Sequence, residues 1–526
     1  MAHKNDIISR KMWMDDDSDS DSTNVLQRFE NLLQRVKEND PSVTEIDSIY
    51  WYREYIQNMT DDDWGQLGHD LNNNTHLQEL SLIEGVLNDQ KMMSLFGGMT
   101  GSKSIERIEL RHNEFGVEGV RSMMPLLQNA SNLKVLDVTQ NNIGSEGFNL
   151  LLRALSSSPI ETLNSWDCGI ESIEIDDEHI PKKLTALSLA NNNIDIAGCR
   201  QLARLLHSVN STLTFFSINE SNIQSEGINL LWSALCDGPI KTLSCSGCGV
   251  ESIEIDDDHI PKELQVLNLS DNMFSVEGCR GLTKLLRGED SKLRTLKLEN
   301  SSIDDGGVAI LVNALQDNES LKYLYLNRNE SISNRGKAML LKLVNDITSI
   351  KATLKSNHTL QILTVDKSTE EGGADDDSTS TRSSSSEETN DCLFQRYIKA
   401  AILTNAVNRQ ERVGREKVIK TQLDSVIRSD LCRLLGVDRS LYSEIDPLHL
   451  PEVLSLVGQC HGQKELFVAL KSSVADLIST VNRKQCIQQQ MAYHAAKLQE
   501  LGADLAAIEE ADRNVVEIGS SKRRRI

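Results

Sequence analysis

Several short groups of residues in this 526-residue chain have types and spacings that could support chemistry. Gly97–Ser104 reads GGMTGSKS and comes close to a phosphate-binding loop. That motif needs a glycine directly before its lysine and a helix after the loop, so that backbone amides face the phosphate. Here Ser102 precedes Lys103, and the strand-like segment IERIEL follows. We therefore expect a turn at this position and no nucleotide site.

Cysteine and carboxylate groups suggest metal or redox chemistry, and each has a simpler explanation. Cys245 and Cys248 have the spacing of a redox pair or of half a zinc site. The runs Asp176–His179 and Asp256–His259 contain carboxylates of the kind that hard cations bind. Consecutive side chains of an extended segment point to opposite faces, so the carboxylates of one run do not converge. We expect no metal, no cofactor and no catalytic residue, and hence no enzyme.

A repeated segment accounts for most of these residues. Ten segments follow the pattern L-x-x-L-x-L-x-x-N/C-x-L at intervals of 24 to 29 residues, beginning at Leu77, Ile105, Leu133, Ile160, Leu184, Leu213, Ile240, Leu264, Leu293 and Leu321. One polar position of the pattern, named the ladder position here, holds Asn113, Asn141, Cys168, Asn192, Ser221, Cys248, Asn272, Ser301 and Asn329, while Gly85 departs from it. In a stack of such units the leucines form a continuous core, and the ladder side chain satisfies backbone groups in the turn. Cys248 is thus a ladder residue, and Cys245 occupies a leucine position.

This pattern, with a helical stretch in most units, resembles the ribonuclease-inhibitor-like leucine-rich repeats. The resemblance covers about residues 43–366. It implies an α/β leucine-rich-repeat solenoid, a horseshoe with a parallel sheet on its concave face and mostly helices on its convex face. A mainly α-helical region would follow at the C-terminus.

Two 24-residue units are too short for a convex helix, and their prolines Pro181 and Pro261 favour an extended segment instead. The run Ser172-Ile-Glu-Ile-Asp-Asp recurs at Ser252, 80 residues later, which is the length of three consecutive units. Part of the array is therefore expected to descend from a duplicated block of three repeats.

Composition divides the chain into four regions. Residues 1–42 are expected to be an acidic, disordered N-terminus, and residues 43–366 the repeat domain, in which Val43 and Ile46 belong to an N-terminal cap. A long helical stretch is expected at 335–356, before a last strand that contains Leu363. Residues 367–391 form a Ser- and acid-rich linker that is too polar to fold alone, and residues 392–526 are expected to be helical.

The C-terminal region resembles the helical tail of leucine-rich repeat proteins of unicellular algae, a resemblance that implies no chemistry. Apolar residues spaced by four and three residues over Ile487–Ile508 suggest a coiled coil that could form a homodimer; the alternative is a helix packed within the tail. The basic end Lys522–Arg525 suggests a nuclear-import signal, against a solvated terminus.

The concave face is the feature of the sequence that bears most on function. Side chains alternate along a strand, so the third, fifth and seventh residues of each unit should face the concave side if the leucines face the core. Tyrosine, tryptophan and arginine are the residues that most often anchor protein interfaces. The candidate protein-binding residues are therefore Arg107, Arg111, Trp166, Phe215, Lys297, Tyr323 and Tyr325. The alternative is that some of them pack against the chain's own tail.

Charge and composition limit the kinds of partner. The net charge is −23, of which residues 43–365 carry −17, so nucleic acid and anionic membranes are disfavoured. No apolar run is long enough to span a membrane, and the N-terminus lacks the apolar core of a secretory signal. We expect a cytoplasmic or nuclear scaffold that binds a protein on its concave face. The alternatives are a small-GTPase regulator, because the layout is similar to that of Ran GTPase-activating proteins, and a signalling or immune sensor, because the repeats resemble those of NOD-like receptors.

Overall fold

The computed structural model describes residues 22–47, 56, 58–84, 87–207, 211–236, 238–255, 260–288, 290–348, 350–365, 390–407, 431 and 433–435. The chain divides into two units. The first comprises Met1–Gly336 and Ile362–Ser378, and the second comprises Lys337–Gln361 and Thr379–Ile526.

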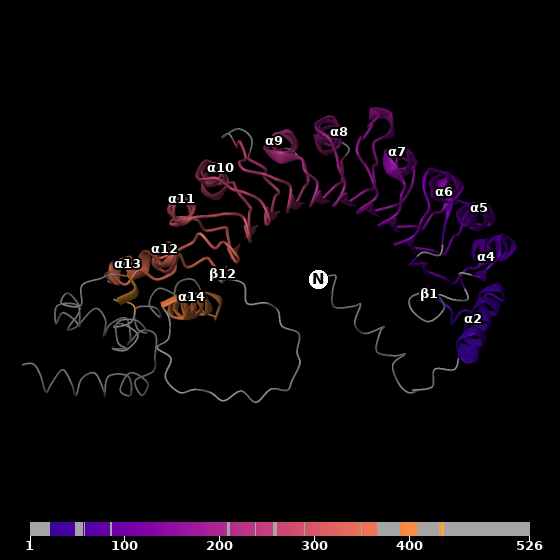
Figure 1. Cartoon of the computed structure of the whole chain (residues 1–526), viewed down its shortest axis with the longest axis horizontal. Helices are drawn as coiled ribbons and strands as arrows, with labels where there is room; N and C mark the ends of the chain where they lie inside the picture. Colours follow the sequence, from indigo (N-terminus) through magenta and orange to yellow (C-terminus); the bar gives the residue numbers. More distant parts are fainter. Residues whose placement is uncertain are drawn as a thin grey trace, which may run out of the picture. The chain divides into compact units, whose positions relative to one another are not determined.

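The first unit is built on one parallel sheet. Within the described residues the sheet has 12 strands in sequence order. They are β1 (Glu45–Asp47), β2 (Glu79–Ser81), β3 (Arg107–Glu109), β4 (Val135–Asp137), β5 (Thr162–Asn164), β6 (Ala186–Ser188), β7 (Phe215–Ser217), β8 (Thr242–Ser244), β9 (Val266–Asn268), β10 (Thr295–Lys297), β11 (Tyr323–Tyr325) and β12 (Ile362–Thr364). The strands line the inner side of a curved array and the helices line its outer side (Figure 1). This arrangement confirms the predicted leucine-rich-repeat solenoid.

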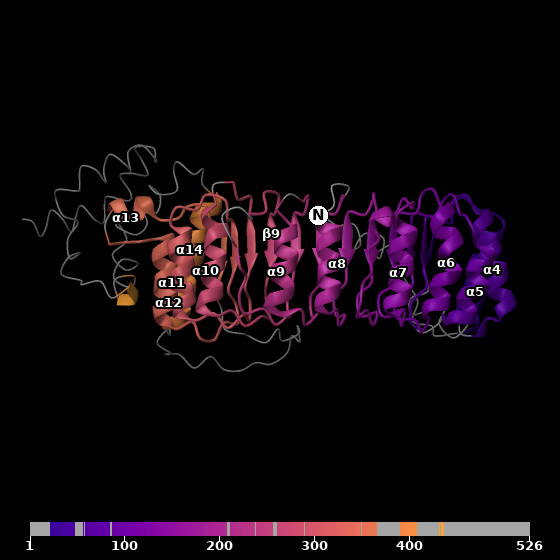
Figure 2. The same cartoon turned by 90° about the horizontal axis from the view of Figure 1, so that it is seen from above.

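Helices connect most successive strands of the first unit and stand side by side along its outer face (Figure 2). They are α4 (Asp61–Asn73), α5 (Asp89–Gly98), α6 (Val117–Asn129), α7 (Gly144–Leu155), α8 (Ile196–His207), α9 (Gln224–Ala234), α10 (Val276–Arg287) and α11 (Asp305–Leu315), preceded by α2 (Ser22–Lys37). No helix in the described part of the chain is both long enough and apolar enough to cross a lipid bilayer.

Repeat leucines form the core between sheet and helices. The central residue of each strand from β2 to β11 is 0% exposed, among them Leu80, Leu187 and Leu296. Burial of one such side chain stabilises the fold by about 1.5–3 kcal/mol. Because every unit contributes the same residues, the core runs continuously from one repeat to the next.

The ladder residues satisfy buried backbone groups, as the sequence predicts. Asn192 Nδ2 donates hydrogen bonds to the carbonyls of Ser165 (2.8 Å) and Leu189 (2.9 Å). Cys248 Sγ donates to the carbonyl of Ile218 at 3.1 Å. Each of the other ladder asparagines donates to one carbonyl of its own unit and to one carbonyl of the preceding unit, which links each turn to the preceding one.

The described residues of the two short units form no α-helix on the outer side, as the length of the units predicts. The first contains only a 3-10 turn, η1 (Asp177–His179). Ser145 Oγ of the preceding helix accepts hydrogen bonds from the amides of Glu171 (3.0 Å) and Ser172 (2.9 Å). Ser225 does the same for the amides of Glu251 and Ser252, 80 residues later. The neighbouring helix thus supplies the acceptors that an extended segment cannot supply itself.

Two sequence expectations need correction. Within residues 1–42, expected to be disordered, Ser22–Lys37 forms helix α2, whose Phe29 and Val36 are each 1% exposed. The helix is ordered because it packs against α4, and Asn74 Nδ2 donates to the carbonyl of Val36 at 2.9 Å. The stretch 335–356 contains two helices, α12 (Asn334–Val344) and α13 (Ile350–Lys355), instead of one long helix.

The second unit begins its C-terminal part with α14 (Asn390–Val407), a helix in the region where the sequence predicts one. One face of α14 is buried and includes Phe394, Ile398 and Ile402. Asn405 Nδ2 donates to the carbonyl of Leu360 at 2.6 Å within the same unit. The predicted coiled coil Ile487–Ile508, the basic end Lys522–Arg525 and residues 367–389 of the predicted linker 367–391 lie outside the described residues.

Candidate protein-binding surface

The inner face of the sheet is organised in three parallel rows of side chains. Strand register aligns the third residues of the units in one row and the fifth residues in the next, as in Thr295↔Tyr323 and Lys297↔Tyr325. Backbone hydrogen bonds align the seventh residues in a third row, because the amide of Gln140 donates to the carbonyl of Trp166 and the amide of Asn300 to that of Asn327. All seven sequence-predicted residues lie in these rows, but the structure places them in different surroundings.

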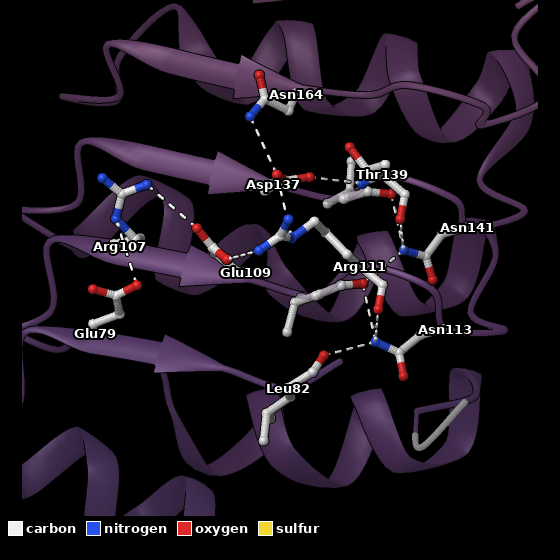
Figure 3. A network of polar contacts seen from close by, with 12 residues as sticks. Glu79, Leu82, Arg107, Glu109, Arg111, Asn113, Asp137, Thr139, Asn141 and Asn164 are labelled. Carbon is white, nitrogen blue, oxygen red and sulfur yellow. Dashed lines mark hydrogen bonds and ion pairs between the residues drawn. The ribbon is translucent and has the colours of Figure 1, made fainter. Parts of the chain in front are cut away.

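Arg107 and Arg111 belong to an ionic network over β2 to β5 (Figure 3). Arg107 Nε lies 3.7 Å from Glu79 Oε1, and Arg107 Nη1 lies 3.4 Å from Glu109 Oε1. Arg111 pairs with the second oxygen of Glu109, and its Nε lies 3.8 Å from Asp137 Oδ2. Both arginines are therefore already neutralised by carboxylates of neighbouring strands.

The network is anchored into the fold beneath it. Asp137 is 7% exposed, and its two oxygens accept from the amide of Thr139 (3.0 Å) and from Asn164 Nδ2 (3.2 Å). Because Asp137 is held in this way, it fixes Arg111 above the sheet. The arrangement gives this end of the face a rigid, largely self-paired polar surface.

Acidic side chains outnumber the arginines at this end. Strand β1 places Glu45 opposite Glu79, and Asp47 opposite Ser81. The pKa of Glu45 is raised above its usual value by partial loss of water and by the nearby carboxylates of Asp47 and Glu109. The pKa of Glu79 is also raised, mainly by loss of water, although Arg107 acts in the opposite direction. Like-charge repulsion therefore persists at the β1 end of the face at neutral pH.

We predict that Glu45→Gln raises the free energy of unfolding at pH 7 by about 0.5 kcal/mol, the size typical of exposed charge interactions. The folded-state pKa of Glu45 lies above the unfolded value, so folding takes up protons and the wild type loses stability as pH rises through the folded pKa. The variant's advantage should therefore be largest at pH 7 and vanish below about pH 4. Urea unfolding at several pH values measures the difference in stability between Glu45→Gln and wild type. Glu330→Gln is the control, because Glu330 is an exposed glutamate. A variant less stable than wild type at pH 7 would contradict the repulsion.

The other end of the face carries the aromatic candidates. Lys297 Nζ lies 5.6 Å from the centre of the Tyr325 ring, a cation–π distance. In the seventh row, next to the row of Lys297 and Tyr325, Asn327 Nδ2 donates a hydrogen bond to Glu299 Oε1 at 3.1 Å. Loss of water, followed by the charges of Glu299 and Tyr323, raises the pKa of Tyr325. Lys297, Tyr323 and Tyr325 on β10 and β11, together with Glu299 just after β10, thus form one cluster, named the tyrosine–lysine cluster below.

Phe215 and Trp166 lie between the two ends of the face. Phe215 is 39% exposed, and its neighbours across the strands are the small side chains of Ala186 and Thr242. Trp166 is partly buried in the turn after β5. The structure therefore does not gather the seven candidates into one patch: two belong to the ionic network, three to the tyrosine–lysine cluster, and two stand apart.

Sequence reasoning missed the inner-face role of Glu45 and Asp47. The signal was present, because Val43 and Ile46 have the same spacing as Leu77 and Leu80, and the strands they begin pair in register. The repeat that begins at Val43 departs from the ladder pattern, and this departure concealed the inner-face positions of Glu45 and Asp47.

The cysteines of the candidate motifs are buried in the core, and the first acidic run lies on the outer side of a short unit. Cys245 and Cys248 are both 0% exposed, and burial raises the pKa of Cys199 and Cys279 to about 12. His179 Nδ1 contacts Asp176 Oδ2 at 3.0 Å on the outer side of a short unit. Among the described residues, no group of three or more His, Cys, Asp or Glu side chains is arranged to hold a metal ion. The second acidic run, Asp256–His259, lies outside the described residues.

Comparisons with known proteins agree with the repeat geometry. The family model described as Leucine Rich repeat matches residues 129–148. Ribonuclease inhibitor of Sus scrofa is 24% identical over 319 residues, covering 51% of this chain and 68% of that protein. "NACHT, LRR and PYD domains-containing protein 14" of Mus musculus is 28% identical over 278 residues. That match covers 50% of this chain but only 25% of the mouse protein.

Among solved structures, an internalin from Listeria monocytogenes is 14% identical with a TM-score of 0.35, covering 65% of this chain and 89% of the internalin. The chain is a leucine-rich repeat protein, and its sequence is similar to that of the ribonuclease inhibitors.

Proposed function

We propose that this chain is a non-enzymatic scaffold that binds a protein partner on the inner face of its repeat sheet. The observation that carries the proposal is the exposed aromatic content of that face, with Phe215 39% exposed and both tyrosines of β11 partly exposed. Tyrosine and tryptophan bury a large area at low entropic cost and dominate many interfaces. The sheet holds them rigidly, so little ordering is needed when a partner binds.

The relatives support the same function. The ribonuclease inhibitors are named for acting on a protein, and the match to the Sus scrofa protein covers 51% of this chain. The match to NACHT, LRR and PYD domains-containing protein 14 of Mus musculus covers 50% of this chain, although this chain spans only a quarter of that protein. We infer that the repeats serve recognition in this chain too, with a partner of its own.

Replacing both Trp166 and Tyr325 by alanine is expected to reduce partner capture at least tenfold. Each truncation at an interface anchor typically costs about 2 kcal/mol or more, and every 1.4 kcal/mol is a tenfold change in affinity. The measurement is affinity purification with the tagged full chain, followed by quantitative mass spectrometry of the co-purifying proteins. Circular dichroism should show that the double variant keeps the wild-type fold.

Met93→Ala is the matched control for this experiment. Met93 is 49% exposed on the outer helix α5, so its removal deletes a comparable apolar side chain from the opposite face. Its capture profile should equal that of wild type. Unchanged capture by the double variant would refute binding on the inner face.

A further inference from the structure

The inner face has one cation that differs from the others in its surroundings. The basic residues at the third, fifth and seventh positions of the ten repeats are Arg107, Arg111 and Lys297. The two arginines lie within ion-pair distance of carboxylates. Among the described residues no ion pair joins Lys297 to a carboxylate, and Lys297 Nζ instead lies over the ring of Tyr325. Lys297 therefore keeps an ammonium charge that the fold itself does not neutralise.

The acid two residues after Lys297 accepts a hydrogen bond from a side chain of the next repeat. Glu299 accepts a hydrogen bond from Asn327 in the seventh row, whereas Lys297 lies in the fifth row. A ring below an ammonium group orients it and leaves its outer side able to bind an anion. An external carboxylate at that position would gain a charge-assisted hydrogen bond.

An apolar platform lies beside the charge. Tyr323 and Ile362 are register partners in the third row, next to the fifth-row pair Tyr325 and Thr364. The two rows are two residues apart along a strand, a distance of about 6.6–7 Å. Lys297 Nζ lies over the ring of Tyr325, which is two residues from Tyr323 on β11. Side chains i and i+2 of an extended peptide have the same separation, so such a segment could place one side chain at the ammonium group and the other on Tyr323 and Ile362.

The opposite end of the sheet disfavours the same ligand. Glu45, Asp47 and Glu79 lie close together on β1 and β2; loss of water first, and neighbouring carboxylates second, raise the pKa of Glu45, while the pKa of Glu79 is raised mainly by loss of water. A partner carboxylate would be repelled there and attracted at Lys297. Charge therefore favours the β10–β11 end of the face as the binding position of an acidic segment.

We propose that the tyrosine–lysine cluster binds an extended segment of a partner protein in which an aspartate or glutamate is separated by one residue from an apolar side chain. The carboxylate binds Lys297 above the Tyr325 ring, and the apolar side chain packs on Tyr323 and Ile362. This assignment rests on the proposed function and specifies the class of sequence that the inner face recognises.

Phage display of random 12-residue peptides on the immobilised full chain tests the assignment. Peptides selected by wild type should be enriched at least fivefold in the acidic–x–apolar pattern over the starting library. Lys297→Glu should abolish this enrichment and favour lysine or arginine instead. Lys103→Glu, a charge reversal at an exposed lysine in the loop before β3, should select the same peptides as wild type. Equal thermal melting of the three proteins excludes misfolding as the cause.

Several outcomes would overturn the assignment. They are the recovery of no peptide, a wild-type pool without acidic enrichment, and the same enrichment from Lys297→Glu. A synthetic peptide of residues 366–391, which carry a net charge of −7, provides a further arm. If it binds wild type but not Lys297→Glu, the occupant is a segment of this chain and the external partner is refuted.

The test separates this assignment from the proposed function. If Trp166→Ala/Tyr325→Ala loses partner capture while wild type selects no acidic pattern, the inner face binds a partner and only the tyrosine–lysine assignment fails. If capture is unchanged, the proposed function fails first.

Discussion

Asn192→Ala is expected to lower the free energy of unfolding by about 3–4 kcal/mol. Asn192 is 3% exposed and donates to the carbonyls of Ser165 and Leu189. Its side-chain oxygen accepts from the amides of Cys168 and Ile170, both at 3.0 Å. Alanine would leave these buried groups without a partner, and each unsatisfied buried group costs about 1–3 kcal/mol. Some relaxation of the turns keeps the total below the simple sum.

Urea unfolding followed by circular dichroism measures this loss. Asn132→Ala is the matched control, because Asn132 is exposed and makes one side-chain hydrogen bond, to the carbonyl of Lys103 at 2.6 Å. The control should cost less than about 1 kcal/mol. Asn192→Ser should fall between the two, since Ser221 and Ser301 hold ladder positions in other repeats. A loss for Asn192→Ala no larger than that of the control would refute the role of the ladder in stability.

Gly281→Ala is expected to destabilise the fold by about 2–3 kcal/mol. Gly281 lies on α10, and a Cβ atom there would sit 2.0 Å from the carbonyl oxygen of Ile253 in the neighbouring short unit. Gly278, one turn earlier, faces the carbonyl oxygen of Glu251 at 2.2 Å in the same way. Both obstacles are backbone atoms, so the helix and the extended segment would have to separate, and overpacking of this kind typically costs about 1–3 kcal/mol.

Gly97→Ala tests whether the effect arises from contact or from the loss of a glycine. Gly97 lies in helix α5, and a Cβ atom there would have nothing within 4 Å. Alanine at that site should stabilise the protein by about 0.5–1 kcal/mol, because glycine is unfavourable inside a helix. Thermal unfolding of both variants provides the comparison. Equal effects at the two positions would contradict the close approach of α10 to the short unit.

The duplicated sequence does not reveal how closely α10 approaches the short unit. The residue 80 positions before Gly281 is Gln201, on α8. The two copies share one glycine, Gly198 in the first and Gly278 in the second, but its surroundings differ. A Cβ atom at Gly198 would lie 3.7 Å from the nearest backbone atom outside its own helix, the amide nitrogen of Ile173. The two copies have similar sequences but different helix-to-segment spacing, which depends on packing that the alignment does not contain.

The repeat architecture could be predicted from the sequence because its rules are local. Leucine spacing, the ladder residue and the alternation of side chains along a strand all follow from backbone geometry within one unit, and equal units must stack. The same rules placed Trp166, Phe215 and Tyr325 on the inner face. The repeat that begins at Val43 was harder to predict, because only Val43 and Ile46 mark it. Helix α2 was missed because its order comes from packing on α4.

The sequence by itself determined the solenoid, its ladder and the rows of its inner face. Only the tertiary structure decided which of those residues have charges left for a partner. The repeat pattern places Arg107, Arg111 and Lys297 alike on the inner face, yet the arginines meet Glu79, Glu109 and Asp137 whereas Lys297 meets Tyr325. The reason is physical: strand register brings together side chains from neighbouring repeats, many residues apart along the chain. Their pairing depends on distances between strands, which no pattern within one unit contains.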